Sequence, residues 1–185
     1  TAAAPEVDDV DAPTHDATVT LTGRVVEPGA GITIEVAGGA SAASAATDES
    51  TGAFTIDVAL NANATNELSV TSLEGEISSP PTLVTVVHDD IAPTAPDSGR
   101  IAIGTPGGLG CTLRGATPVN GMTSAVEGNS SVRVMNMTGG GSSTSNANPD
   151  GSFNLSVPAC AADILRLTAT AAAGNVSEVP ERVVG

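Results

Sequence analysis

The chain has 185 residues and a formal net charge of −15, with six arginines, no lysine and 21 acidic residues. Nucleic acids and anionic membrane surfaces need a basic face on their protein partner, so this charge balance argues against both as partners. Two phenylalanines are the only aromatic residues, which leaves no stacking platform for bases or sugar rings. No apolar run approaches the roughly 20 residues of a membrane helix, so membrane insertion is not expected.

Short runs of alternating apolar and polar residues predict β-strands with one buried face. In the first half of the chain these runs cover residues 19–25, 32–36, 54–60, 68–70 and 84–86. In the second half they cover residues 111–113, 132–134, 153–157 and 165–167. Stretches rich in Gly, Ser, Asn and Pro separate the runs, and no amphipathic helix longer than two turns stands out. This pattern predicts all-β sandwich architecture.

The second half of the chain repeats the first. Residues 51–85 align with residues 150–184 at a constant offset of 99, which makes Phe54 and Phe153 equivalent. Upstream, residues 32–34 match residues 132–134 at an offset of 100. Residues 20–23 also resemble residues 112–115, an alignment that requires extra residues around 118–124. The chain is therefore predicted to be a tandem repeat of two domains.

A second repeat marks the predicted junctions. The segments 9–14 and 89–94 share an Asp-x-x-Ala-Pro-Thr pattern, which suits an extended connector because proline lacks the amide hydrogen. We predict that residues 1–13 form an N-terminal extended segment or linker, 14–88 the first domain, 89–96 a linker, and 97–185 the second domain. Residues 96–110 have no counterpart in the first unit and are interpreted as an inserted loop, with a short strand at 100–103.

The repeated motifs resemble those of a known family. They are the acidic turns followed by Gly-x-Phe at residues 50–54 and 149–153, the Leu-to-Pro stretches 68–81 and 167–180, and the acidic connector 90–93. These residues resemble bacterial immunoglobulin-like (Big-type) repeats of surface adhesins and secreted multidomain proteins. The resemblance implies two tandem immunoglobulin-like β-sandwich domains joined by a short acidic, proline-containing linker, located extracellularly or at the cell surface. The buried Trp and the Tyr corner of antibody domains are absent.

The two cysteines, Cys111 and Cys160, both lie in the second unit. Their pairing cannot be read from spacing alone, although an oxidising compartment would permit it. In the repeat alignment they fall where a disulfide would join the first long strand to the end of the strand carrying Phe153. Such a bond would contribute about 2–4 kcal/mol.

Acidic residues cluster before each predicted domain: Asp8, Asp9 and Asp11 before the first, and Asp89, Asp90 and Asp97 before the second. Calcium selects oxygen ligands and needs about six to eight of them. In the adhesin repeats that this sequence resembles, calcium stiffens domain junctions, so the resemblance implies Ca²⁺ at these clusters. No EF-hand spacing is present, and a solvated acidic linker is the alternative interpretation.

The N-terminal segment is too polar and alanine-rich to form a self-sufficient element. It either lies along its own domain or adds as a strand to the sheet edge of a neighbour. In the second case it would join copies of this chain, or neighbouring immunoglobulin-like domains, head to tail. The residues of this candidate assembly segment are Thr1, Ala2, Ala3, Ala4, Pro5, Val7 and Val10.

Nothing in the sequence indicates catalysis. His15 and His88 each stand next to an aspartate beside a predicted connector, but neighbours on an extended chain project to opposite sides. Both are expected to be solvated, and no catalytic residue is predicted. The predicted function is that of a non-catalytic extracellular structural protein, a cell-surface stalk, adhesin segment or spacer. The alternatives are a self-assembling subunit of an extracellular filament or sheath, linked through the N-terminal segment, and accessory domains of a secreted hydrolase.

The charge is unevenly distributed between the two units. Residues before Ser98 contain 16 acidic residues and one arginine, and the remainder contains five of each, which gives −15 and 0. This asymmetry favours a second domain that contacts partners and a first domain that faces solvent or cations.

Overall fold

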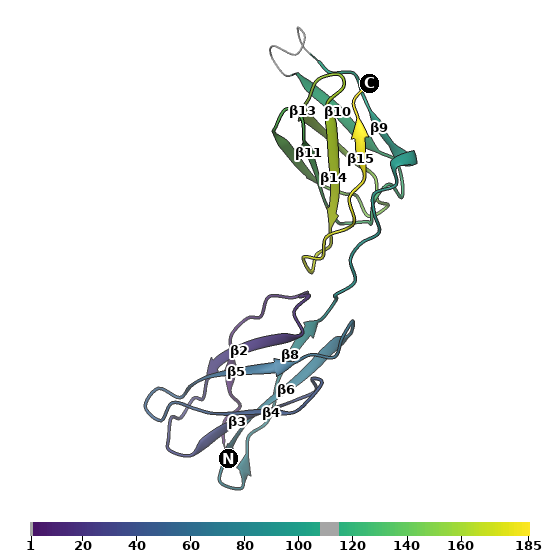
Figure 1. Ribbon diagram of the computed structural model, residues 1–185. Coiled ribbons are helices and arrows are strands. Elements are labelled where there is room, and N and C mark those ends of the chain that lie inside the picture. Colours follow the sequence, from purple (N-terminus) through teal and green to yellow (C-terminus); the bar gives the residue numbers. More distant parts are fainter. Residues whose placement is uncertain (1, 108–114) are drawn as a thin grey trace. The chain divides into compact units, whose positions relative to one another are not determined.

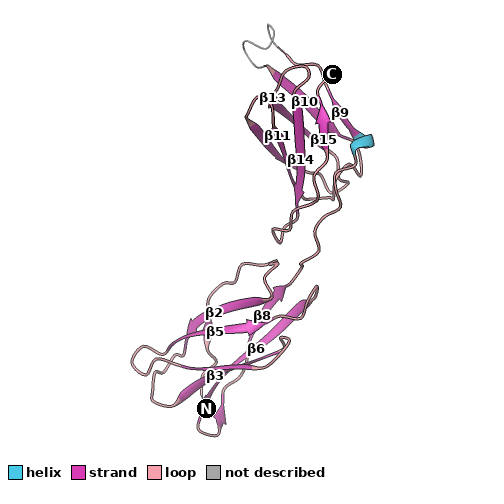
Figure 2. Cartoon of the chain, viewed as in Figure 1, coloured by secondary structure: helices cyan, strands magenta, loops and turns pink. Residues whose placement is uncertain are grey.

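The computed structural model describes residues 2–107 and 115–185, and the chain divides into two compact units at Asp90 and Ile91 (Figure 1). Within the described residues, one three-residue 3₁₀ turn at Ser98–Arg100 is the only helical element, and Figure 2 shows strands and loops elsewhere. No helix in this part of the chain is long and apolar enough to cross a membrane. The prediction of an all-β chain is confirmed.

The first domain is a sandwich of two antiparallel sheets. One sheet has the order β1-β2-β5, with β1 at Glu6–Val7, β2 at Thr18–Arg24 and β5 at Ala53–Ala59. In the other sheet β3 lies between β4 and β6, and both β7 and β8 pair with β6. Their bounds are β3 Ile32–Ala37, β4 Ala43–Ala46, β6 Thr65–Glu74, β7 Ile77–Ser78 and β8 Thr82–Val87.

The second domain repeats this arrangement. One sheet has the order β9-β10-β13, with β9 at Ile101–Ile103, β10 at Ala116–Gly121 and β13 at Phe153–Pro158. The other has the order β12-β11-β14-β15. Its strands are β11 Ser131–Asn136, β12 Ser142–Asn146, β14 Ile164–Thr170 and β15 Glu181–Val183. In both domains the fourth strand, β4 or β12, pairs with the third strand, β3 or β11. In a constant-type immunoglobulin domain the fourth strand pairs with the fifth instead.

Each sandwich has its own core, built from the alternating residues of facing sheets. Both cores are aliphatic and contain one phenylalanine each. In the first domain Leu21, Ile34 and Leu68 are fully buried; in the second, Val119, Leu165 and Leu167 are. Each such side chain contributes about 1.5–3 kcal/mol when it leaves water. Two separate cores of this kind make each unit a domain in its own right.

Strand register corrects the alignment of the second strands. Gly23 lies opposite Phe54 and Gly121 lies opposite Phe153, so Gly121, and not Gly115, is the counterpart of Gly23. The alignment of residues 20–23 with 112–115 is therefore wrong, and Pro118 to Gly121 belong to the strand itself. A similarity of four residues is weak evidence for an alignment. Burial fixes strand register more strongly, because a slip by one residue turns every side chain to the other face of the sheet.

The ungapped alignment also fails beyond the phenylalanine strand. The Ser72 and Ala169 amides each donate to a serine Oγ, at Ser79 and Ser177, so Ser72 and Ala169 are equivalent. This offset of 97, against 99 at the phenylalanines, means that the stretch from Phe153 to Ala169 is two residues shorter than the stretch from Phe54 to Ser72. Ile34 pairs with Ser72, and Val132 pairs with Ala169.

The corrected alignment makes two residues of opposite charge equivalent. Because Ile34 and Val132 are equivalent, Glu35 in β3 corresponds to Arg133 in β11. The alignment at an offset of 100 pairs Arg133 with Thr33, and that pairing is wrong. The misalignment hides a charge reversal between the two domains.

The first strand of each domain is a repeat that the sequence comparison misses. Val7 in β1 pairs with Gly23, and Ile101 in β9 pairs with Gly121, so these two strands are equivalent. The short strand predicted at 100–103 is confirmed, but the expectation that residues 96–110 lack a counterpart is wrong. Strands of two and three residues carry too little sequence for the similarity to be recognised.

The two Asp-x-x-Ala-Pro segments are not equivalent either. Residues 9–14 come after β1 inside the first domain, whereas residues 89–94 precede β9. After β1 the chain crosses to the other sheet, where Thr14 forms a parallel bridge with His88. Residues 9–14 therefore connect the two sheets of one sandwich.

The glycine opposite each phenylalanine is required by close packing. A Cβ placed on Gly121 would lie 2.3 Å from Cε1 of Phe153 and 2.9 Å from Cβ of Ala125. A Cβ on Gly23 would lie 2.7 Å from Cζ of Phe54 and 2.1 Å from the Glu6 carbonyl oxygen. Each ring thus covers the backbone of the neighbouring strand. In the first domain, the missing side chain of Gly23 also lets the Glu6 carbonyl of β1 approach.

Aspartates order the turns before both phenylalanine strands. The Asp48 Oδ1 atom accepts hydrogen bonds from the Ser50 hydroxyl at 2.6 Å and the Thr51 amide at 2.8 Å. These bonds, led by the Ser50 hydroxyl, hold the pKa of Asp48 below its ordinary value. The hydroxyl and amide of Ser152 lower the pKa of Asp150 in the same way, with bonds of 2.7 and 3.0 Å.

His88 is part of the first domain's structure. It is 3% exposed, and its Nδ1 accepts the Asn63 amide hydrogen at 2.9 Å while its own amide donates to the Ala64 carbonyl. The expectation of a solvated linker histidine is wrong for His88, because the turn between β5 and β6 folds over the end of β8. His15 is exposed as expected, but its Nε2 lies 3.8 Å from Oδ1 of Asp16, so these neighbouring side chains do meet.

Substituting Gly121→Ala tests the packing of glycine against phenylalanine. We expect the second domain to lose about 1–3 kcal/mol, because the added methyl group overpacks the contact with Phe153. Gly29→Ala is the control, since its Cβ would meet only Ile32 Cδ1 at 3.5 Å, and it should change stability by less than about 0.5 kcal/mol. Chemical denaturation measures both; equal midpoints for Gly121→Ala and the parent protein would contradict this packing.

The lowered pKa of Asp48 predicts a dependence of first-domain stability on pH. The stabilisation is present above the unfolded pKa of about 3.9 and is lost as the pH falls toward the lower folded value. We expect Asp48→Asn to reduce the melting temperature at neutral pH and to flatten its fall on acidification. Glu49→Gln, at an exposed neighbour, is the control. Melting curves for Asp48→Asn that fall as steeply as those of the parent would refute the role of this carboxylate.

Candidate functional site

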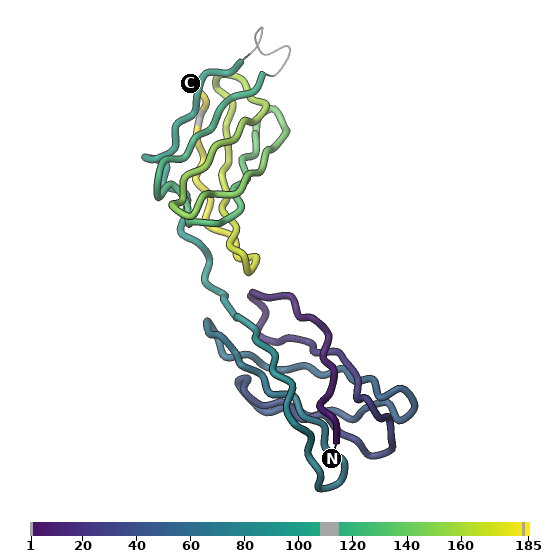
Figure 3. Tube along the Cα trace, turned by 180° about the vertical axis from the view of Figure 1, so that it is seen from behind, coloured from purple at the N-terminus to yellow at the C-terminus, as the bar shows by residue number. Residues whose placement is uncertain are grey.

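The candidate assembly segment packs on its own domain. The Ser72 hydroxyl donates to the Ala3 carbonyl at 3.2 Å, and the Thr82 hydroxyl donates to the Pro5 carbonyl. Val7 and Val10 pack against the first core, and Figure 3 shows the segment running along the first domain. Thr1 lies outside the described residues. Of the two arrangements that the sequence left open, the structure has the segment along its own domain; assembly through it stays a prediction.

The acidic residues of the calcium prediction are dispersed among structural roles. Asp8 accepts a hydrogen bond from the Thr22 hydroxyl at 2.7 Å, and Asp97 caps the 3₁₀ turn and lies 3.4 Å from Arg100. The Asp89 amide donates to Thr14, and the Asp90 amide donates to the Asn63 side chain. Across residues 2–107 and 115–185, no group of three or more His, Cys, Asp or Glu side chains is arranged to hold a metal. Asp9 and Asp11 are exposed in the connection after β1. Calcium binding stays a prediction.

The predicted disulfide falls partly outside the described residues, because Cys111 lies in the gap between residues 107 and 115. Cys160 is 6% exposed at the end of β13, where its amide donates to Oδ2 of Asp163 at 2.9 Å. The Cys111–Cys160 pairing therefore stays a prediction.

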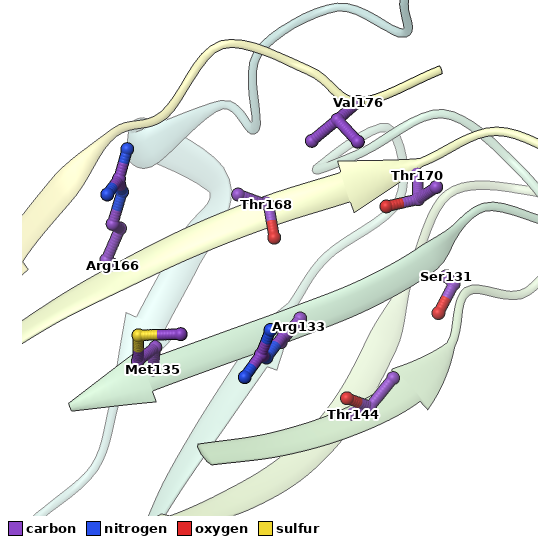
Figure 4. A pocket seen from close by; sticks show the side chains of 8 residues that line it. All are labelled: Ser131, Arg133, Met135, Thr144, Arg166, Thr168, Thr170 and Val176. Atoms are coloured by element: carbon purple, nitrogen blue, oxygen red, sulfur yellow. The ribbon is translucent and has the colours of Figure 1, made fainter. Parts of the chain in front are cut away.

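The outer face of the second domain's four-stranded sheet carries a depression of about 450 Å³. Arg133 from β11 and Arg166 from β14 line it, with Met135 and Val176 at its sides (Figure 4). The remaining lining residues all carry hydroxyl groups: Ser131, Thr144, Thr168 and Thr170. We refer to this surface as the basic face.

The two arginines of the basic face lie close together. Register places Met135 opposite Arg166 and Arg133 opposite Thr168, so the arginines are diagonal neighbours, with backbones about 7–8 Å apart. The Arg133 guanidinium donates weakly to the Ser142 hydroxyl at 3.4 Å. Glu181 is opposite Arg166 in the ladder, yet among the described residues neither arginine forms an ion pair within 4.0 Å. Both guanidinium groups are therefore available to an anion.

The equivalent face of the first domain has the opposite charge. A depression of about 350 Å³ covers β3, β4 and β6 there, lined by Glu35, Ser44 and Thr71 among others. Glu35 occupies the position of Arg133, and Glu67 is exposed on the same face of β6. We refer to this surface as the acidic face. Leu83 of β8, which is 70% exposed, lies opposite Ser69 at its edge.

Sequence reasoning missed both faces. Their signal in the sequence is a pair of arginines, Arg133 and Arg166, on two strands that pair with each other in the second repeat. The alignment at an offset of 100 made Arg133 equivalent to Thr33 and so hid this signal. The excess of arginine in the second half is visible as a total, but only strand register assigns two of these residues to one surface.

Neither protein-family profiles nor curated proteins match this sequence. Solved structures are similar in fold. A Ca²⁺-stabilized adhesin that helps an Antarctic bacterium reach out and bind ice aligns with 99% of this chain, at 18% identity and a TM-score of 0.49. This chain covers 48% of that structure, about half its length.

Two tandem fibronectin type III structures are similar as well. The fibronectin(III)-like modules of Clostridium thermocellum CbhA align with 94% of this chain and 90% of their own length, at 14% identity and a TM-score of 0.48. A two-domain segment of chicken tenascin aligns with 97% of this chain and 98% of its own length, at 15% identity and a TM-score of 0.36. The structural matches thus include bacterial adhesin domains and tandem fibronectin type III modules.

Proposed function

We propose that this chain is a non-catalytic extracellular spacer, a segment of the stalk of a cell-surface protein. The observation that carries the proposal is the direction of the chain in the first sandwich. Thr14 runs parallel to the end of β8, so the early part of the domain and its last strand point the same way. The polypeptide enters at one end and leaves at the other.

Such a domain holds its two neighbours along a polypeptide apart by its own length. The longest strand, β6, has ten residues and spans about 33 Å. The second domain has the same strand order, with β9 and β15 in place of β1 and β8. Repeats of this kind add distance in proportion to their number, which is the property that a stalk requires.

Docking of the first strand supports the same function. β1 and β9 each complete a three-stranded sheet inside their own sandwich. A first strand that peeled away would replace ordered structure with loose chain, and a spacer would lose its fixed length. Hydrogen bonds from Ser72 and Thr82 hold the segment before β1 in place.

Small-angle X-ray scattering of the chain and of a head-to-tail fusion of two chains tests the spacer function. We expect the maximum dimension to grow by about 60 Å in the fusion, since two further sandwiches of about 30 Å each are added. The fusion unfolded in guanidinium provides the reference for a disordered chain. A folded fusion with the same maximum dimension as the single chain would contradict the proposal.

A further inference from the structure

The two domains present the same sheet surface with opposite charge. On the basic face, Arg133 and Arg166 are exposed and form no ion pair with a described residue. On the acidic face, Glu35 and Glu67 are exposed on the equivalent strands. The first domain has one arginine, Arg24, and it lies in the other sheet, where it is paired with Glu6 at 2.7 Å.

We propose that the basic face of one copy of this chain binds the acidic face of a second copy. The pairing brings the Arg133 and Arg166 guanidinium groups against the Glu35 carboxylate, and Glu67 lies four residues along β6 from Thr71, the register partner of Glu35. Arg is suited to this contact because its planar fork matches the carboxylate. Surfaces of opposite potential also steer their own encounter. The proposal places self-association on the sheet faces and is independent of the spacer function.

Net charge selects this pairing over its symmetric alternatives. Residues 1–90 contain 15 acidic residues and one arginine, and residues 91–185 contain six acidic residues and five arginines, which gives −14 and −1. Two first domains repel each other strongly, and two basic faces repel each other locally. A first domain against a second domain avoids the strongest of these repulsions, and it is the pairing in which the local charges of the two contacting faces are opposite.

The shapes and the apolar groups of the faces fit the same pairing. Both faces are depressions in the outer surface of a sheet. Hydroxyl side chains surround the arginines of the basic face, whereas alanines and the hydroxyl side chains of Ser44, Ser69 and Thr71 surround Glu35 on the acidic face. Met135 lies beside Arg166 on the basic face, and Leu83 lies at the edge of the acidic face with 70% of its surface exposed. Burial of these two side chains would add an apolar component to the charge pairing.

Because the two faces differ, the contact is heterologous. Each copy would keep one face unsatisfied after a single contact, so association continues into a closed ring or an open chain. The interaction is electrostatic between exposed groups, and salt therefore weakens it.

Sedimentation velocity of the full chain, over a range of concentrations and at low and high salt, tests the proposal. We expect oligomers at low salt that dissociate at high salt. The double variants Arg133→Glu/Arg166→Glu and Glu35→Arg/Glu67→Arg should each weaken association about tenfold or more, since like charges then face each other. The variant carrying all four substitutions restores opposite charges and should associate again.

Glu27→Arg/Glu76→Arg is the matched control, because it makes the same change of net charge at exposed positions outside the acidic face. It should not weaken association. Thermal melting checks that every variant folds. A monomeric parent at all concentrations in low salt would overturn the proposal, as would single-face variants that associate like the parent or a fourfold variant that stays monomeric. A monomeric parent that binds heparin or polyglutamate through Arg133 and Arg166 would assign the basic face to a different anionic partner.

Discussion

A phenylalanine ring lying over a glycine of the neighbouring strand sets the register on which each sandwich depends. The contact occurs twice, at Gly23 with Phe54 and at Gly121 with Phe153. Because the ring occupies the space of a side chain, a slip of one residue would both expose the ring and drive another side chain into it. The only two aromatic residues of the chain are therefore used for the same purpose in both repeats.

The same glycine in each domain also pairs with the first strand of the sandwich. β1 and β9 pair with the second strand opposite Gly23 and Gly121, and in the first domain the Glu6 carbonyl approaches the position that a Cβ would occupy. The first strand thus belongs to the sandwich through the same feature that places the ring. Residues on the outward faces take no part in this packing, so their charge is free to differ between the repeats, as Glu35 and Arg133 do.

Much of the fold is predictable from the sequence because burial leaves a period of two in the longer strands. The runs beginning at Val19, Ile32 and Phe54 all became strands with alternating burial. β1 and its equivalence to β9 escaped recognition because two or three residues carry no period. The buried role of His88 depends on a turn that folds over it, and no local pattern reports such a contact.

The two charged faces could not be predicted because they depend on strand register beyond a connection whose length differs between the two domains. The stretch from Phe153 to Ala169 is two residues shorter than the equivalent stretch from Phe54 to Ser72. An ungapped alignment misses this difference because small apolar residues match at many offsets. Net charge of the two halves indicated an asymmetry correctly. Which side chains share a surface is determined only by the pairing of β11 with β14.

Amide hydrogen exchange at Asp8 tests most directly whether the first strand is an integral part of its own sandwich. The Asp8 amide donates to the Thr22 carbonyl at 2.9 Å, whereas the Asp16 amide bonds only to the nearby Thr14 hydroxyl. Asp8 is predicted to exchange as slowly as Val25, whose amide is held by the Gly52 carbonyl, while Asp16 exchanges quickly. Exchange of Asp8 at the rate of an unstructured peptide, with Val25 still protected, would contradict the docking of β1.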